Sequence, residues 1–447
     1  MLDLMFALAM LVAIPMAIAR PFAAYLLWGW TALMVPSSYL YGFMAGTRVN
    51  LFLALLTFTL IVLGKVSIKG YVNNRMTWFL LLFLAHASAA MLFGYPGNPF
   101  NVQYYVFLVK VMAFTLLMPL FVKERMHIHA MVLVMVFGLG LHGVLDGLKT
   151  IVSAGAHNMY GPRDTVITDR NHLSTALAML LPLVYYLHLN SQHRWIRWLF
   201  LGAFAVIVLA IMGGRSRGGF LAISVVGCWL VFTSRAKMKA LFMVVVVGGI
   251  LLLLAPEEWT SRMNTIQTAG EDESFVGRLV AWRISSALAL SNPVFGGGFH
   301  ALQIQSVWDQ FKAEPGLLGF LNLGVPEFDA KAAHSIYFEV LGDLGFVGLA
   351  IFLFILFYAV YSRFSIKGMA ADLGPSFTWA RDLADMLMLS VVAYLIGGAG
   401  VSLSYFELIY MIVMLMEMLR MHVAGAAKQQ VLQRKANGRA ELERTRS

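Results

Sequence analysis

Residues 332–361 read AAHSIYFEVLGDLGFVGLAIFLFILFYAVY, and after Ser335 the stretch is almost entirely apolar. An apolar run of about twenty residues or more is long enough to cross a bilayer as an α-helix. His334 stands immediately before this run, at the point where a long polar loop enters it. The stretch therefore predicts a membrane-spanning helix with an ionisable side chain at its water-facing mouth, a position suited to chemistry.

The rest of the chain repeats the apolar pattern. The 447 residues are 60% hydrophobic and only 13% charged, a balance that excludes a soluble domain. We therefore predict an all-α, polytopic membrane protein of about twelve transmembrane helices. Residues 3–19 are also apolar but end close to prolines, and the sequence leaves open whether they span the membrane. The predicted spans are residues 22–45, 50–66, 76–95, 103–123, 127–151, 171–189, 195–213, 217–233, 239–255, 335–361, 384–402 and 404–422.

The distribution of positive charge predicts the orientation. The net charge of +10 resides in short loops between apolar segments and in the C-terminal tail. This is the positive-inside pattern of membrane proteins, and it argues against a nucleic-acid partner. We place in the cytoplasm the basic loops at residues 65–75, 123–125, 193–197, 235–239 and 363–381. The alternate loops, at residues 96–101, 154–170, 213–219 and 256–333, then lie on the opposite side.

We expect one integral membrane domain with four parts. Residues 1–255 form the N-terminal transmembrane helices, 256–333 a large external loop, 334–425 the C-terminal transmembrane helices and 426–447 a basic cytoplasmic tail. A loop of this length usually carries function or its own structure, so we predict short helices within it. Residues 299–311 have apolar side chains at helical spacing, which favours an amphipathic helix on the membrane surface.

A first candidate site is the turn GGRSRGGF at residues 213–220. Arg215 and Arg217 lie on the side where positive charge is disfavoured, so another role must explain them. A helix is expected to begin near Gly218, where free backbone amides attract anions, and arginine adds planar donors suited to phosphate. The competing interpretation is that both arginines reach toward lipid headgroups.

A second candidate lies in GRLVAWR at residues 277–283, which precedes NPVFGGG at residues 292–298. Arg278 would begin a short helix, another favourable anion position, and Arg283 is a secondary candidate on the same helix. The glycine triplet permits close backbone approach and positive φ. The alternative interpretation, which the sequence supports equally, is that Arg278 is exposed and pairs with the acidic residues at 271–273.

His334 is the candidate general base, because neutral imidazole accepts a proton from a hydroxyl near ambient pH. The competing interpretation is that His334 forms a structural hydrogen bond at a helix end. Glu339 follows on a different helical face, so it is not expected to orient the ring directly. Arg170 and His172 open another helix on the same side and are secondary candidates, beside Asp169 as a helix cap.

No metal or cofactor is expected. The histidines show no spacing with Asp or Glu that is typical of a metal site. The sequence also lacks a phosphate-binding loop, a dinucleotide fingerprint and a nucleophile elbow. Cys228 is the only cysteine, which excludes an intrachain disulfide.

These motifs, in this order, resemble the O-antigen ligase and O-antigen polymerase superfamily. Residues 19–21 and 28–30 are in addition similar to a branch described as O-glycosylation ligases. Many relatives have Asn after the histidine, so the resemblance assigns no role to Ser335. The similarity rests on SRGG at residues 216–219, GRLVAW at 277–282, NPVFGGG at 292–298, and His334-Ser335 leading to Glu339, Gly345 and Gly348.

The resemblance implies a glycosyltransferase in the bacterial inner membrane with its active site facing the periplasm. The donor would be a glycan on undecaprenyl diphosphate, and the favoured acceptor a hydroxyl of lipid A–core oligosaccharide. Arg217 and Arg278 match family arginines that would bind the diphosphate, with Arg215 as a further candidate. His334 matches the family histidine and would be the general base of a metal-independent, inverting transfer.

Two alternatives remain open. Within the family, a growing glycan or a protein hydroxyl competes with lipid A–core as the acceptor, and the motifs do not separate these. A lipid or solute transporter is a different class, for which GGAG at residues 397–400 would be a broken or closely packed helix. The glycan and the oligomeric state are not determined by the sequence.

Overall fold

The computed structural model describes residues 2–69, 71, 73–233, 238 and 273–444. Helices α1 to α9 run along the first half of the chain, and α12 to α16 along the second. No strand occurs in the described residues, so the predicted all-α class is confirmed.

The α-helices are α1 Leu2–Ala19, α2 Pro21–Met34, α3 Val49–Val62, α4 Arg75–Phe93, α5 Asn101–Phe121, α6 Arg125–Val152, α7 Arg170–Asn190, α8 Arg194–Gly213, α9 Arg217–Thr233, α12 Glu273–Ser291, α13 Gln305–Phe311, α14 Ile336–Asp372, α15 Thr378–Gly397 and α16 Glu407–Arg444. Five short 3-10 helices accompany them: η1 Pro36–Ser38, η2 Ala301–Gln303, η3 Gly316–Leu321, η4 Pro375–Phe377 and η5 Gly398–Gly400.

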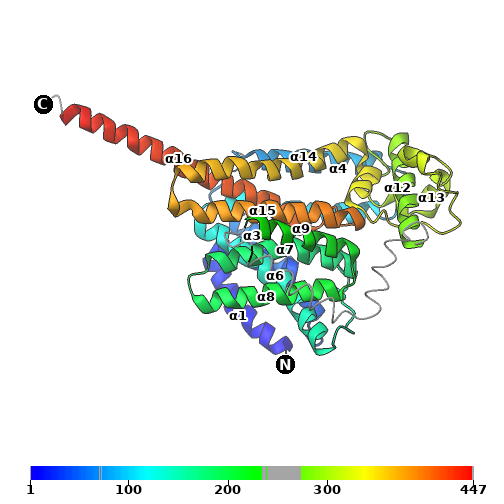
Figure 1. The fold of residues 1–447 in the computed structure, drawn as a ribbon, viewed down its shortest axis with the longest axis horizontal. Helices are drawn as coiled ribbons and strands as arrows, with labels where there is room; N and C mark the ends of the chain where they lie inside the picture. The colour runs from blue at the N-terminus through cyan, green and yellow to red at the C-terminus, as the bar shows by residue number, and fades with distance from the viewer. Residues whose placement is uncertain (1, 70, 72, 234–237, 239–272, 445–447) are drawn as a thin grey trace.

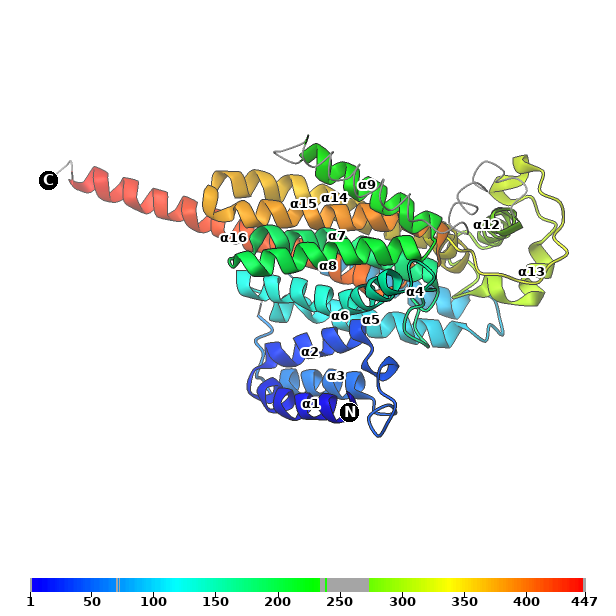
Figure 2. The same cartoon turned by 60° about the horizontal axis from the view of Figure 1, so that its bottom comes forward.

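The long helices lie roughly parallel and form a layered bundle (Figure 1). Helices α1 to α3 form an outer layer, beside which α5 and α6 and then α7 and α8 follow, with α14 and α15 beyond them (Figure 2). Nine helices in the described part of the chain are long and apolar enough to cross a membrane, α1 among them. The chain is therefore a multi-pass membrane protein.

Several predicted helix bounds were wrong in an explicable way. The span predicted at 22–45 ends at Met34, because Val35 adopts a left-handed backbone and Pro36 starts a 3-10 helix. The last helix does not stop near residue 422 but continues to Arg444 through the predicted start of the tail. It projects from the bundle as a single rod (Figure 1). The helix predicted at 239–255 lies outside the described residues.

A helical cap, residues 275–333, covers one end of the bundle (Figure 2). Its α12 is longer than the short helices predicted there, and the predicted amphipathic helix at 299–311 reduces to η2 and α13. Trp308 and Phe311 of α13 are buried in the cap's own apolar cluster. The apolar side of this segment therefore packs against protein, which corrects the expectation of a helix lying on the membrane surface.

The cap is joined to the bundle at a kink in α14. Gly345 has φ of +69°, a conformation that glycine adopts without strain. The freed N–H of Phe346 donates to the Pro293 carbonyl at 2.9 Å, and Gly297 N–H donates to the Gly342 carbonyl at 2.8 Å. A Cβ on Gly296 would lie 2.6 Å from the Gly342 carbonyl oxygen. The glycine triplet thus serves the close backbone approach that the sequence predicts.

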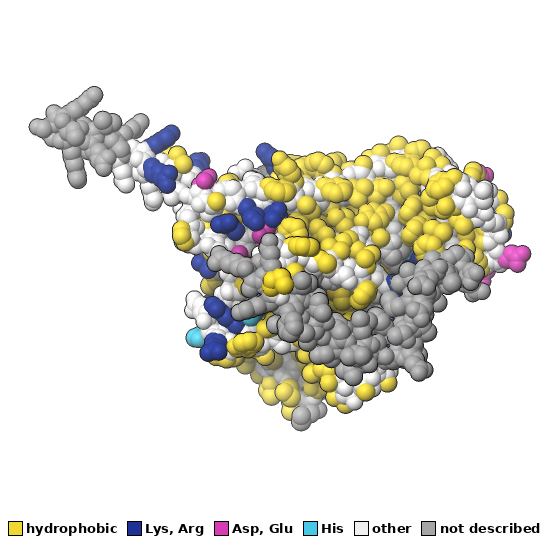
Figure 3. All heavy atoms as spheres, viewed as in Figure 1, with side chains coloured by type: hydrophobic (Ala, Val, Ile, Leu, Met, Phe, Trp, Pro, Cys, Tyr) yellow, Lys and Arg dark blue, Asp and Glu magenta, His cyan; other side chains and the backbone are white. Residues whose placement is uncertain are grey.

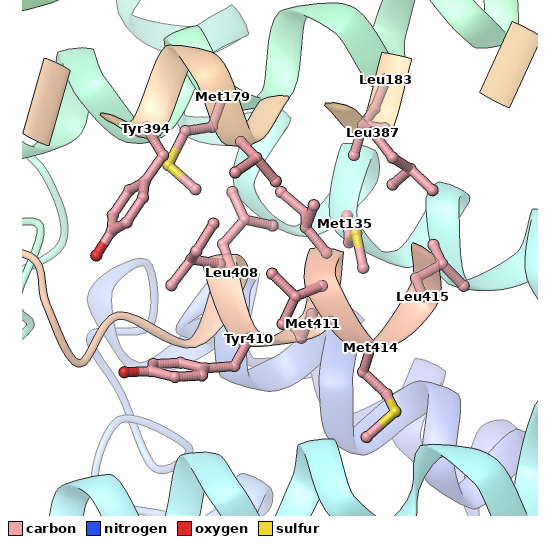
Figure 4. Close-up of a cluster of buried hydrophobic side chains, with 14 of the residues drawn as sticks. Met135, Met179, Leu183, Leu387, Tyr394, Leu408, Tyr410, Met411, Met414 and Leu415 are labelled. Atoms are coloured by element: carbon pink, nitrogen blue, oxygen red, sulfur yellow. The ribbon is translucent and has the colours of Figure 1, made fainter. Parts of the chain in front are cut away.

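The centre of the bundle is filled by Met, Leu and Tyr side chains from α6, α7, α15 and α16 (Figure 4). Met135, Met179, Leu387 and Met411 point toward one another in this cluster (Figure 4). All four are at most 1% exposed. This packing fixes the loop between α15 and α16 relative to α7.

The contact between α6 and α8 gives a test of the packing. An alanine Cβ at Gly147 would lie 2.1 Å from the backbone oxygen of Val206. We expect Gly147→Ala to separate the two helices and to destabilise the fold by about 1–3 kcal/mol, seen as a lower midpoint of thermal inactivation in detergent. Gly202→Ala is the matched control, because a Cβ there meets nothing within 4 Å. Equal midpoints for the two variants would contradict this packing.

Candidate functional site

The candidate site is built around the glycine run at the end of α15. A Cβ on Gly397 would lie 2.8 Å from the Thr175 side chain of α7, and one on Gly398 would lie 2.6 Å from Ile336 of α14. Because these residues have no side chains, several helices can approach the same point. We name the segment 397–406, which contains η5 and the loop to α16, the glycine loop.

The start of α9 reaches the glycine loop directly. Ser216 caps this helix by accepting the Gly219 N–H at 3.2 Å, so Arg217 is its first residue. A Cβ on Gly218 would lie 3.3 Å from the Gly397 carbonyl oxygen. Arg215 lies just outside the helix with φ of +51°, and its guanidinium donates to the Gly155 carbonyl at 3.4 Å. Both candidate arginines of this turn therefore lie at one end of the bundle, next to a helix N-terminus.

Arg278 reaches the glycine loop from the cap. Its Nη1 atom is 3.5 Å from the place where a Cβ on Gly400 would be. The start of α12 and the start of α9 are thus brought to neighbouring parts of the glycine loop.

His334 arrives from the other end of the cap. Its φ of +46° is uncommon for a residue with a side chain and imposes some strain. The conformation is held on both sides: the His334 N–H donates to Ser402 Oγ at 3.0 Å, and Trp282 Nε1 donates to the Ala333 carbonyl at 2.7 Å. His334 is consequently fixed between α12 and the glycine loop.

A buried polar network supports the glycine loop from behind. Glu339 accepts the Ser404 N–H at 3.0 Å and also accepts the Ser404 hydroxyl. Asp343, one turn further along α14, accepts the Tyr405 hydroxyl and the His300 N–H, each at 2.9 Å. All five residues are buried. Through Ser404, the Glu339 carboxylate holds the loop whose Ser402 bonds to the backbone of His334.

Two tyrosines complete this support. The Tyr394 hydroxyl donates to the Leu403 carbonyl at 2.9 Å, and the Tyr410 hydroxyl donates to the Ser404 carbonyl at 2.7 Å. Their rings form part of the apolar cluster in the bundle (Figure 4). Buried polar backbone groups require such partners, so the loop has a defined conformation.

The electrostatics of the site favour a neutral His334. Burial lowers the pKa of His334 to about 4, and the nearby charges of Arg278, His172 and Lys331 act in the same direction. Asp169 acts in the opposite direction and raises the pKa. At neutral pH the imidazole is therefore unprotonated and able to accept a proton.

Of the secondary candidates, His172 lies beside His334, whereas Arg283 lies elsewhere, inside the cap. The ring centroids of His172 and His334 are 6.4 Å apart. Arg170 is the first residue of α7, two positions before His172. Arg283 is 5% exposed and donates to the carbonyls of Lys312, Leu323 and Gly324 within the cap.

Sequence reasoning missed the glycine loop as the receiving surface of the site. Ser402, Ser404, Tyr394 and Tyr410 lie far from the motifs and carry no pattern of their own. The available signal is the GGAG run at residues 397–400, which the sequence presents only as a feature of a transporter. In the part of the chain that the structure describes, no group of three His, Cys, Asp or Glu is placed to hold a metal ion.

The fold and the site together define an integral membrane protein with arginine and histidine side chains gathered at one capped end of its bundle. Residues 202–353, which contain Arg215, Arg217, Arg278 and His334, match the family model described as O-antigen ligase. The chain accordingly carries an O-antigen ligase domain, and this domain supports a membrane glycosyltransferase or ligase of that family. The resemblance that the motifs indicated is confirmed at this level.

The N-terminal helices give a separate match. Residues 1–192 match a second family model, described as a family of unknown function. This region supplies α7 with Asp169 and His172, so the site draws on both matched regions. No curated protein matches the chain.

Proposed function

We propose that the chain is an inverting, metal-independent glycosyltransferase of the bacterial inner membrane. It moves an O-antigen-type glycan from undecaprenyl diphosphate to a hydroxyl of lipid A–core oligosaccharide at the periplasmic face. The observation that carries this proposal is the meeting of His334, Arg278 and the start of α9 at the glycine loop. Residues more than a hundred positions apart thus supply a base and an anion site in one place.

The donor's diphosphate is bound by Arg217 and Arg278, with Arg215 as a further ligand. Arginine presents paired donors to phosphate oxygens, and the first backbone amides of α9 add a favourable dipole. These charges stabilise the diphosphate as it leaves, without requiring a metal ion. The apolar faces of the bundle accommodate the polyprenyl tail.

His334 activates the acceptor. The imidazole takes the hydroxyl proton while the acceptor oxygen forms a bond to the anomeric carbon on the face opposite the diphosphate. The bond from the anomeric carbon to the diphosphate oxygen breaks, and the diphosphate keeps the electron pair. A single displacement of this kind inverts the anomeric configuration.

The distribution of charge supports the proposed orientation. Lys and Arg side chains gather at the end of the bundle opposite the cap (Figure 3). Arg363 and Lys367 lie there, both paired with Asp385. A positive cytoplasmic side supports a periplasmic location of the cap and the site.

The pH profile is a direct test of the base. Because the pKa of His334 is lowered to about 4, the neutral form is already dominant well below neutral pH. We expect kcat/KM for the donor to stay level from about pH 8 to about pH 5, where an ordinary histidine would cause a fall near pH 6.5. Donor binding adds negative charge beside Arg278, which favours imidazolium, so the acid limb of kcat should lie at higher pH. A fall of kcat/KM near pH 6.5 would contradict a base with this pKa.

The first experiment is a transfer assay with purified protein, undecaprenyl-diphosphate glycan and lipid A–core, in the presence of EDTA. Product from the wild type supports a metal-independent ligase with this acceptor. If only a peptide or a glycan acceptor is modified, the mechanism stands and the acceptor changes. Movement of the lipid-linked glycan across vesicles without any new glycosidic bond would instead support the transporter.

A further inference from the structure

A second histidine lies beside the candidate base and is itself paired with a carboxylate. His172 Nδ1 is 3.2 Å from Asp169 Oδ1, and the ring centroid of His172 is 6.4 Å from that of His334. The side chain of His172 is 12% exposed, so it lies at the edge of the site with limited access to water. This pair comes from the start of α7, an element that contributes nothing else to the proposed mechanism.

The pairing fixes which nitrogen of His172 carries a proton. Asp169 also accepts the Asn171 N–H at 2.8 Å and caps α7. Although burial acts in the opposite direction, the hydrogen bonds from His172 and Asn171 keep the pKa of Asp169 below its ordinary value. Since an ionised carboxylate can only accept, His172 donates from Nδ1 and leaves Nε2 free to take a proton.

The charges around His334 make it a poor place to keep a proton. Arg278 from α12 and Lys331 from the approach to His334 both disfavour its imidazolium form. Asp169 is the carboxylate that acts on the pKa of His334, and Glu339 lies close enough to His172 to be affected by its charge. Glu339 is engaged by Ser404, whereas Asp169 is already bonded to a titratable ring.

We propose that Asp169 and His172 form a proton relay that takes the acceptor's proton from His334 and passes it to water. The inference rests on the proposed function and deepens it. The acceptor's O–H proton moves to His334 as the glycosidic bond forms and the diphosphate leaves with the bonding electrons. The proton then moves from His334 to Nε2 of His172, directly or through one water, and Asp169 stabilises the resulting imidazolium.

A relay residue has kinetic signatures that a structural residue lacks. We expect His172→Gln to lower kcat roughly 10- to 100-fold at pH 7 and to leave the donor KM unchanged. The deficit should shrink as the pH rises, because hydroxide then removes the proton from His334. Added imidazole should restore at least part of the kcat of His172→Ala. Asp169→Asn should share the kcat loss, because an amide can also donate and reverse the ring's tautomer.

The chain offers a matched control at the same end of the bundle. His157 pairs with Asp146 at 3.1 Å, in the same type of histidine–carboxylate contact. His157→Gln and His157→Ala should keep the wild-type kcat and show no response to imidazole. A loss common to both histidines would indicate a general effect on the fold and would overturn the relay.

The outcomes separate the relay from the proposed function. Wild-type transfer with an unchanged kcat in His172→Gln overturns the relay alone. A raised donor KM with wild-type kcat at saturation also overturns it and assigns His172 to diphosphate binding. A wild type that transfers glycan to no hydroxyl acceptor overturns the proposed function, and the relay with it.

Discussion

His334→Ala is expected to reduce transfer by about a thousandfold while the protein stays folded and inserted. Among the described residues, the imidazole has no hydrogen bond that holds the site together, whereas the backbone N–H of His334 bonds to Ser402, and alanine keeps that group. The loss should therefore appear in kcat. The measurement is glycan transfer under saturating donor, with donor binding followed separately.

Two controls make the result specific. His157→Ala removes a histidine outside the proposed machinery and should leave the rate unchanged. The midpoint of thermal inactivation of His334→Ala should stay close to that of the wild type. Equal transfer by wild type and His334→Ala would remove His334 as the base, whatever acceptor is used.

Arg278→Gln is expected to give the second large loss, roughly 100- to 1000-fold in kcat/KM. The guanidinium reaches the glycine loop beside Gly400, and its charge is one of the causes of the lowered pKa of His334. Glutamine keeps part of the volume and removes the charge. Donor binding should weaken, and the acid limb of any residual activity should move to higher pH, because a positive neighbour of His334 is lost.

Arg283 provides the contrast within the same helix. Its buried guanidinium donates to three carbonyls of the cap, so Arg283→Gln removes these three hydrogen bonds. We expect that variant to lower the inactivation midpoint of the protein, whereas Arg278→Gln should not. If Arg278→Gln loses stability and keeps its transfer rate, diphosphate binding by Arg278 is wrong.

The sequence predicted the fold class well because long apolar runs have one stable solution in a bilayer. The predicted helix bounds were wrong where local backbone geometry ends a helix, as at Val35. The predicted surface helix was wrong because the polar loop forms its own apolar core around Trp308. Arg283 illustrates a deeper limit. The sequence makes it a secondary anion ligand on the same helix as Arg278, and only tertiary packing reveals that both of its terminal nitrogens donate to carbonyls of the cap.

The candidate site shows the same division. His334, Arg278 and Arg217 could be named because their residue types stand out against an apolar background. The glycine loop could not, because the hydroxyls of Ser402, Ser404 and the two tyrosines bond to backbone groups that any sequence possesses. The sequence does not reveal which hydrogen-bond partner each N–H and carbonyl has, because packing between distant helices determines these partners.

The bond from the His334 N–H to Ser402 has a consequence for protein engineering. The segment that matches O-antigen ligases ends at residue 353, whereas the hydroxyl that fixes the backbone of His334 lies almost fifty residues later. A chimera that exchanges only the matched segment would therefore combine a histidine from one parent with an anchor from another. Grafting a new specificity onto this scaffold requires that residues 397–406 travel with the histidine.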